Sequence, residues 1–125
     1  MAQFNVSGGS GYVRTYRKVT VTFDQITAAE TNTEDVDCAG ASSAWVQFRA
    51  SSCTGTAACR VRSQMNFSSG QVGSAQAHSA GNMTSSSLVR NVDCPVAGDK
   101  LRMEIVTTGA SVDVTPSVDV YLFGT

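Results

Sequence analysis

The sequence predicts an all-β protein, an antiparallel β-sandwich that is jelly-roll-like and contains seven or eight strands. Three observations support this fold class. Apolar and polar residues alternate with a period of two along several segments, as in strands that bury one face in a core. Turn signals separate these segments, and no segment has a convincing helical period. The length of 125 residues is that of a single domain.

Residues 1–11 are expected to form a flexible N-terminal arm, ahead of a single sandwich domain over residues 12–125. Gly8, Gly9 and Gly11 lie in the arm. Glycine is conformationally permissive, so this cluster predicts a hinge.

The first strand of the domain is expected over residues 12–23, where β-branched and aromatic residues favour extended structure. Two tyrosines lie here beside a small basic group formed by Arg14, Arg17 and Lys18. Such a group can contact an acidic partner or a nucleic acid. More often it is the solvated face of an edge strand, which is the interpretation that we prefer.

The strand from Trp45 to Ala50 is expected at the centre of the sandwich. Val46, Phe48 and Ala50 share one face, whereas the other face carries the only tryptophan of the chain, a glutamine and an arginine. This alternation predicts a strand with one face in the core.

Three other segments make up the middle of the chain. Residues 24–40 are polar and acidic and predict a long connection with short extended pieces, without the residue pattern of a calcium-binding loop. Residues 60–67 alternate again and predict a half-buried strand. Residues 68–87 are almost entirely small and polar, so we expect a long surface loop that a partner could order, with His78 exposed in it.

The C-terminal part has the most regular pattern. Leu101, Met103 and Ile105 alternate with charged residues, and residues 117–123 form the last strand. One face of this last strand is apolar, and the other carries Tyr121 and Phe123. Large apolar groups on both faces predict a strand that is covered by the core on one side and by a neighbouring molecule on the other.

The four cysteines are expected to form two disulfides. Cys53 and Cys59 flank a short segment with a central glycine, which predicts a hairpin loop that a bond would close. Cys38 and Cys94 each end the same Val-Asp-Cys phrase and are expected to pair with each other. Four free thiols are the alternative. Zinc is disfavoured, because closely spaced ligand pairs are missing.

Charge and residue patterns exclude several functional classes. The net charge of −1 leaves no broad basic surface for nucleic acid, and no apolar run is long enough to cross a membrane. The single histidine and the scattered carboxylates form no constellation for acid–base or nucleophilic catalysis. We therefore expect no enzyme activity, no cofactor and no metal.

The glycine-rich arm, the loops rich in Ser, Gly and Ala, and the extended segment Ser117-Val118-Asp119-Val120-Tyr121-Leu122-Phe123 together resemble small virion proteins of tailed bacteriophages. The type that the chain resembles most is the decoration or cement protein of capsids. The resemblance implies a structural protein that is made in the host cytoplasm, sits on the outside of the virion and stabilises the shell. It also implies a homo-oligomer, most often a trimer, that binds the capsid protein without any catalytic residue.

Two alternatives remain open. One is a carbohydrate-binding β-sandwich module, for which an aromatic cluster on one face would be the distinguishing observation; Tyr12, Tyr16, Trp45 and Tyr121 are the candidates. The other is a component of a phage tail or fibre. The residues that we expect to contact a partner are Phe4, Tyr12, Arg14, Tyr16, Arg17, Tyr121 and Phe123.

Overall fold

The computed structural model describes residues 3–10, 15–38, 40–64, 76–96 and 98–124. Within these ranges the chain forms seven strands, all of whose pairings are antiparallel, and no helix, which confirms the predicted all-β antiparallel class. The strands are β1 (Gln3–Ser10), β2 (Thr15–Thr22), β3 (Thr31–Asp37), β4 (Ala41–Gln64), β5 (Gln76–Met83), β6 (Arg90–Pro95) and β7 (Lys100–Gly124).

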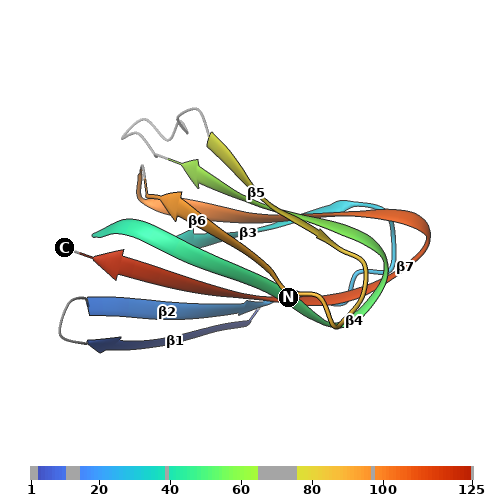
Figure 1. Cartoon of the computed structure of the whole chain (residues 1–125), viewed down its shortest axis with the longest axis horizontal. Coiled ribbons are helices and arrows are strands. Elements are labelled where there is room, and N and C mark those ends of the chain that lie inside the picture. The colour runs from blue at the N-terminus through green and yellow to red at the C-terminus, as the bar shows by residue number, and fades with distance from the viewer. Residues whose placement is uncertain (1–2, 11–14, 39, 65–75, 97, 125) are drawn as a thin grey trace.

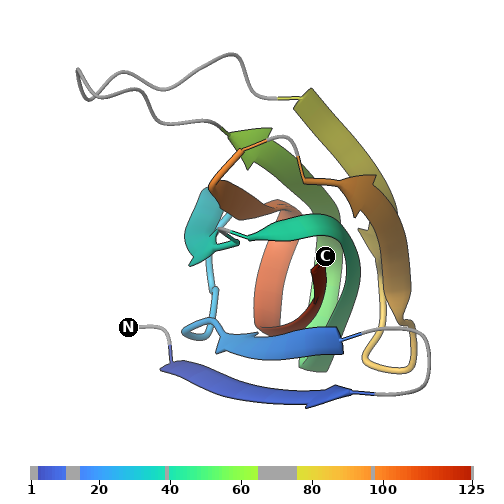
Figure 2. The ribbon, with the colours of Figure 1, turned by 90° about the vertical axis from the view of Figure 1, so that its left-hand side faces the viewer.

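The seven strands form one hydrogen-bonded sheet that folds over into two layers (Figures 1 and 2). It folds because β4 and β7 are long and pair with each other along most of their length, passing together from one layer to the other. The first layer has the order β1, β2, the C-terminal half of β7, the N-terminal half of β4, and β6. The second layer has the order β3, the N-terminal half of β7, the C-terminal half of β4, and β5.

The bend between the layers replaces the hairpin that the sequence predicts at Cys53–Cys59. These residues lie inside β4, so the hairpin prediction is wrong. The β4–β7 register shifts between Ala50 and Cys53 and again between Thr54 and Thr56. Bulges of this kind bend a strand and increase its twist without ending it. Gly55 and Gly109 allow the bend, because both have positive φ angles, of 90° and 135°.

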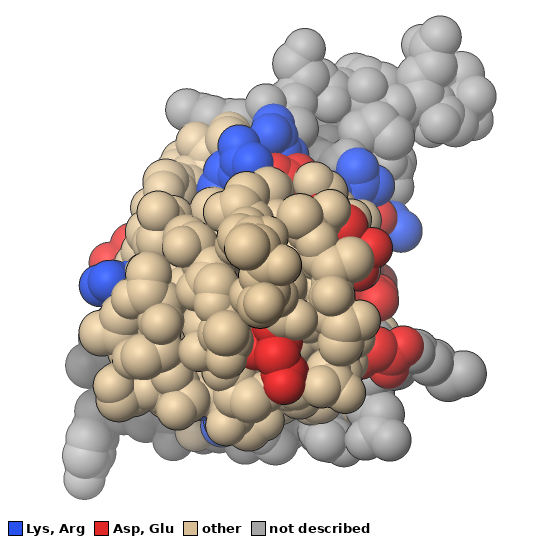
Figure 3. All heavy atoms as spheres, turned by 90° about the vertical axis from the view of Figure 1, so that its right-hand side faces the viewer, with Lys and Arg blue, Asp and Glu red and all other residues tan. Residues whose placement is uncertain are grey.

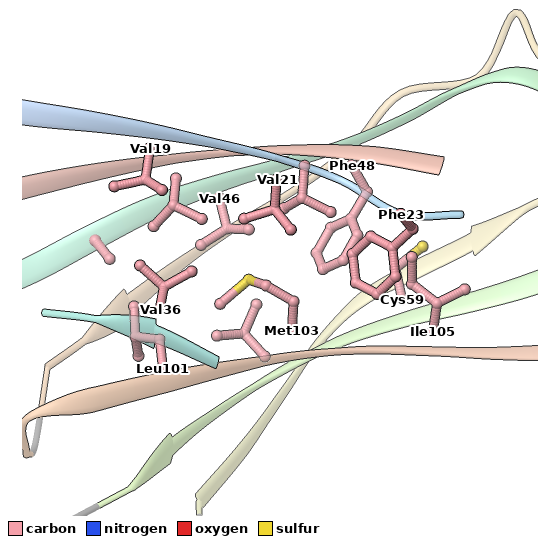
Figure 4. Packing of buried hydrophobic residues seen from close by; sticks show 14 of the residues in the cluster. Val19, Val21, Phe23, Val36, Val46, Phe48, Cys59, Leu101, Met103 and Ile105 are labelled. Carbon is pink, nitrogen blue, oxygen red and sulfur yellow. The ribbon is translucent and has the colours of Figure 1, made fainter. Parts of the chain in front are cut away.

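The core lies between the two layers, where inward-facing side chains of both meet (Figure 4). Val21, Val46 and Phe48 of the first layer face Leu101 and Met103 of the second, and each of the five is fully buried. The strand periodicity predicted from the sequence therefore identifies the buried faces correctly in β4 and β7. At the bent end of the molecule the surface is mainly uncharged. One acidic group lies below the middle of this face, and other charged side chains lie toward its margins (Figure 3).

Parts of the expected arm and of the expected loop over residues 68–87 form strands in the structure. Residues 3–10 lie along β2 as strand β1, whereas we expect a flexible arm; its mobility stays a prediction. Within the expected loop 68–87, residues Gln76–Met83 form β5, because β4 offers this small-residue segment a complete hydrogen-bonding edge. His78 is half-buried in β5 opposite Val61, so the expectation of an exposed loop histidine is wrong.

Candidate functional site

Three aromatic side chains gather on the outer face of the first layer. The ring centroids of Trp45 and Tyr121 are 5.5 Å apart with an interplanar angle of 49°, and those of Tyr16 and Tyr121 are 6.2 Å apart at 45°. These spacings are typical of favourable aromatic pairs. Trp45 and Tyr121 are half-buried, and Tyr16 is 37% exposed. We call Tyr16, Trp45 and Tyr121 the aromatic platform.

The platform results from strand alternation combined with register. In β4 and β7 the residues on either side of Trp45 and Tyr121 point into the core, so these two rings must point outward. The ladder then places Trp45 directly opposite Tyr121, and Tyr121 directly opposite Lys18 of β2. The Lys18 ammonium is 5.4 Å from the centroid of the Tyr121 ring, within the range of a cation–π contact.

A fourth side chain completes this row across the strands. Asp93 of β6 lies opposite Trp45, so Lys18, Tyr121, Trp45 and Asp93 follow one another on four adjacent strands. Three inter-strand spacings separate the two charged ends, so their backbones are about 14 Å apart. The site is therefore a pair of aromatic rings with a cation at one end and a carboxylate at the other.

An open pocket of about 390 Å³ adjoins the carboxylate end of the row. Phe123 provides an aromatic wall, and Asp93, Ser42 and Ser43 provide oxygen atoms. The hydroxyl of Ser42 donates to the backbone oxygen of Phe123 at 3.2 Å, which ties the start of β4 to the end of β7. The pocket therefore combines an apolar surface with hydrogen-bonding groups, as ligand sites commonly do.

A buried carboxylate supports the face beside the platform. Asp119 is 4% exposed and accepts hydrogen bonds from the hydroxyl of Thr20 at 2.8 Å and from the guanidinium of Arg49 at 3.0 Å. The second carboxylate oxygen of Asp119 lies 2.9 Å from the same guanidinium. Burial of Asp119 is tolerated because its charge is paired and hydrogen-bonded.

The residues predicted to contact a partner fall into two groups. Tyr16, Tyr121 and Phe123 lie together on the outer face of the first layer. Phe4 and Arg17 instead line a second pocket, of about 230 Å³, together with Val36 of β3. Phe4 is 46% exposed there, and Arg17 donates to the backbone oxygen of Asp37 at 2.9 Å. Tyr12 and Arg14 lie outside the described residues.

Lys18 and Asp93 are members of the row that the sequence does not connect with each other. Lys18 stands out only as part of the basic group with Arg14 and Arg17, and Asp93 looks like an ordinary surface charge, because no local motif links β2 to β6. Among the described residues no group of three or more His, Cys, Asp or Glu could hold a metal ion, and the expected lack of a metal stays a prediction.

The four cysteines are free thiols in this structure, so it contains neither predicted disulfide, and the bonds stay predictions. Electrostatic interaction links Cys53 with Cys59 and Cys38 with Cys94, so the members of each predicted pair lie near one another. Burial raises the pKa of Cys59 to about 12 and, with help from the neighbouring carboxylates of Asp37 and Asp93, those of Cys38 and Cys94 to about 11. Since the thiolate is the species that reacts, burial slows oxidation.

The raised thiol pKa values predict a loss of stability at alkaline pH. An unfolded thiol titrates near its ordinary pKa of 9.0, whereas the folded thiols of Cys38, Cys59 and Cys94 titrate at about 11 to 12. Folding therefore favours the neutral thiols, which contribute to the free energy of unfolding. This stabilising contribution is complete below about pH 9 and is lost as the pH rises through the folded pKa values. Denaturant unfolding in a reducing agent should give a lower unfolding free energy at about pH 10.5 than at about pH 8.

The control is a variant with alanine at Cys38, Cys59 and Cys94. It should lose less unfolding free energy over the same pH interval than the unsubstituted protein. An equal loss in both proteins would show that other groups cause the alkaline effect.

No family model and no curated protein matches the sequence. Among solved structures, the enzymatically active domain of tailspike protein 4 of bacteriophage CBA120 matches with a TM-score of 0.50 and 10% identity, over 98% of this chain and 19% of that one. The family 11 carbohydrate-binding module of Clostridium thermocellum matches with a TM-score of 0.42 and 9% identity, over 99% of this chain and 84% of that one. The SPBc2 prophage-derived protein YomS matches with a TM-score of 0.43 and 16% identity, over 92% and 100%.

The tailspike likeness shows a shared all-β fold, at an identity too low to show a shared activity. The chain spans about a fifth of that tailspike domain. None of the three proteins is named as a capsid decoration protein.

Proposed function

We propose that this chain is a non-catalytic carbohydrate-binding domain of a phage tail or tail fibre, and that sugar rings stack on its aromatic platform. The observation that carries the proposal is the clustering of Tyr16, Trp45 and Tyr121 on one outer sheet face. From the sequence alone, this was the feature expected to favour a carbohydrate-binding module over a capsid decoration protein.

The chemistry of the face suits a sugar. One side of a pyranose ring presents C–H groups, which pack against the electron-rich face of an aromatic ring. Its hydroxyl groups require donors and acceptors at the margin of that contact. Asp93 and Ser43 supply oxygen atoms in the adjoining pocket, and the ammonium of Lys18 supplies donors at the opposite end of the row.

The fold is compatible with this role, and we infer that it is a jelly roll. With the two halves of β4 and of β7 counted separately and β1 set aside as an added edge strand, each layer contains four segments. Jelly rolls occur in lectin domains and in viral capsid proteins, so the fold supports a virion protein and a sugar-binding domain equally. The choice between these roles therefore rests on the outer face.

Location in a tail is supported by the fold likeness to the tailspike domain. The proposal involves no cofactor, no nucleic acid and no membrane. Within the described ranges, no helix of this chain has the length and apolar character needed to cross a membrane.

The test is a calorimetric titration of the purified protein with neutral and acidic oligosaccharides. The neutral set contains cello-, laminari- and manno-oligosaccharides, and the acidic set contains oligogalacturonate, oligoalginate and hyaluronan fragments. At least one should bind, and Trp45→Ala and Tyr121→Ala should each raise its Kd at least about tenfold, which corresponds to about 1.4 kcal/mol.

Phe4→Ala is the matched control, because Phe4 is an exposed aromatic residue that lies away from the platform. It should leave the Kd unchanged. Binding that is unaffected by both platform substitutions, or no binding by any member of the panel, would overturn the proposed function. Circular dichroism of each variant shows whether the fold is retained.

Capsid decoration is the second candidate, with a homotrimer on the shell and the capsid protein as the partner. It is favoured by the half-buried Tyr121 and Phe123 on an outer face, which a symmetric neighbour could cover. Light scattering distinguishes the two proposals. A trimer that Tyr121→Ala dissociates would favour a subunit contact, whereas a monomer that binds sugar would favour the carbohydrate site.

A further inference from the structure

We infer that the ligand of the platform is an acidic glycan whose carboxylate pairs with Lys18 and whose chain lies across the strands toward Asp93. This inference rests on the proposed function and adds the class of sugar and its direction.

The first observation is that both charged ends of the row lack a partner. Among the described residues, the ammonium of Lys18 forms no ion pair and no hydrogen bond, and its contact is with the ring of Tyr121. The carboxylate of Asp93, which is exposed, likewise has no ion pair or hydrogen bond within this part of the chain. A half-buried lysine beside an aromatic ring retains an unmet capacity to bind an anion.

The second observation is that the neighbouring charges on the same face are already paired. The guanidinium of Arg49 forms an ion pair with the carboxylate of Asp119, so the two charges neutralise each other. Among the described residues on and around the platform, Lys18 is therefore the cation that is not paired with a carboxylate and that an anionic ligand could bind. The attraction is directed to one end of the row.

The third observation concerns direction. Because the row crosses β2, β7, β4 and β6, a ligand that touches all four side chains runs perpendicular to the strands. A carboxylate-bearing sugar over Tyr121 can accept a charge-assisted hydrogen bond from Lys18. The next sugar unit then lies over Trp45, where its hydroxyl groups can donate to Asp93. The opposite orientation would place the ligand carboxylate against Asp93 and is disfavoured by like-charge repulsion.

Hyaluronan fragments and their methyl esters form the deciding pair of probes, because they share one backbone, differ in charge and carry a carboxylate only on every second sugar unit. The acid should bind at least about tenfold more tightly than the ester, and added salt should weaken only the acid. Lys18→Met keeps most of the aliphatic stem and removes the charge. It should abolish the preference for the acid, because it weakens binding of the acid about tenfold more than binding of the ester.

Two variants control the comparison. Lys100→Met removes a lysine from the second layer, away from the platform, and should not change the preference. Asp93→Asn removes the negative charge but keeps an oxygen that can accept a hydrogen bond, so it should change the affinity for the acid by no more than about threefold.

The outcomes separate the inference from the proposed function. If the ester binds as tightly as the acid, or if neither binds while a neutral sugar binds through Trp45, the acidic class is wrong and the carbohydrate site stands. If the acid binds but neither Trp45→Ala nor Tyr121→Ala weakens its binding, both are wrong. A failure of every sugar in the panel also overturns both.

Discussion

Replacing Phe48 by alanine is expected to lower the free energy of unfolding by about 3–5 kcal/mol, the usual cost of removing a large buried aromatic side chain. Phe48 is fully buried in the first layer and faces the second across the core (Figure 4). Its removal loses the burial of the ring and leaves a cavity that strands held in two layers cannot close. Since the total stability of a domain is about 5–15 kcal/mol, the loss should be visible directly in denaturant unfolding.

Phe4→Ala is the control for this prediction, since it removes the same side chain from a site that is 46% exposed. It should change the unfolding free energy by no more than about 0.5 kcal/mol. Equal effects of the two substitutions would mean that the core does not lie between the layers as described here.

Replacing Gly55 by alanine is expected to cost about 1–3 kcal/mol for the strained backbone alone, and a steric clash adds to this. Gly55 has a φ of 90°, in the region that favours glycine. A Cβ atom at this position would lie 3.0 Å from the backbone oxygen of Thr108 and 3.1 Å from that of Ser111. Neither oxygen can move without disturbing the bend of β7, so relief of the clash would push β4 and β7 apart at the bend.

Gly40→Ala separates the two contributions. Gly40 has a similar φ of 86°, but a Cβ atom there would have no neighbour within 4 Å among the described residues. The cost at Gly40 should therefore be the backbone term alone, and Gly55→Ala should be measurably more destabilising in thermal or denaturant unfolding. If Gly40→Ala were as costly as Gly55→Ala, the close approach of β4 and β7 at the bend would not matter for stability.

The error at the predicted hairpin has a local cause. Cys53, Gly55 and Cys59 look like a turn because glycine between short polar segments usually ends a strand. In the folded protein the same glycine lets β4 change layer while it keeps its pairing with β7. A hairpin and a bend share this local signal, and the long-range partner decides between them.

The candidate site was only partly predictable. The alternation at Trp45 and at Tyr121 predicts that both rings point away from the core, and this is confirmed. Tyr16 and Tyr121 are among the residues expected to contact a partner. The sequence does not identify Lys18 and Asp93 as members of the same site, because β2 and β6 are far apart along the chain.

By itself, then, the sequence determined the all-β class and, in the regular segments of β2, β4 and β7, which face is buried and which aromatic residues are left outside, since a period of two is a local property of each strand. The tertiary structure alone decided that Lys18, Tyr121, Trp45 and Asp93 form one row. That row depends on which strands are neighbours and on their register. A shift of two residues along any ladder would keep every side chain on its face and still separate the rings from the two charges, so only the long-range hydrogen bonds and the bulges of β4 bring them together.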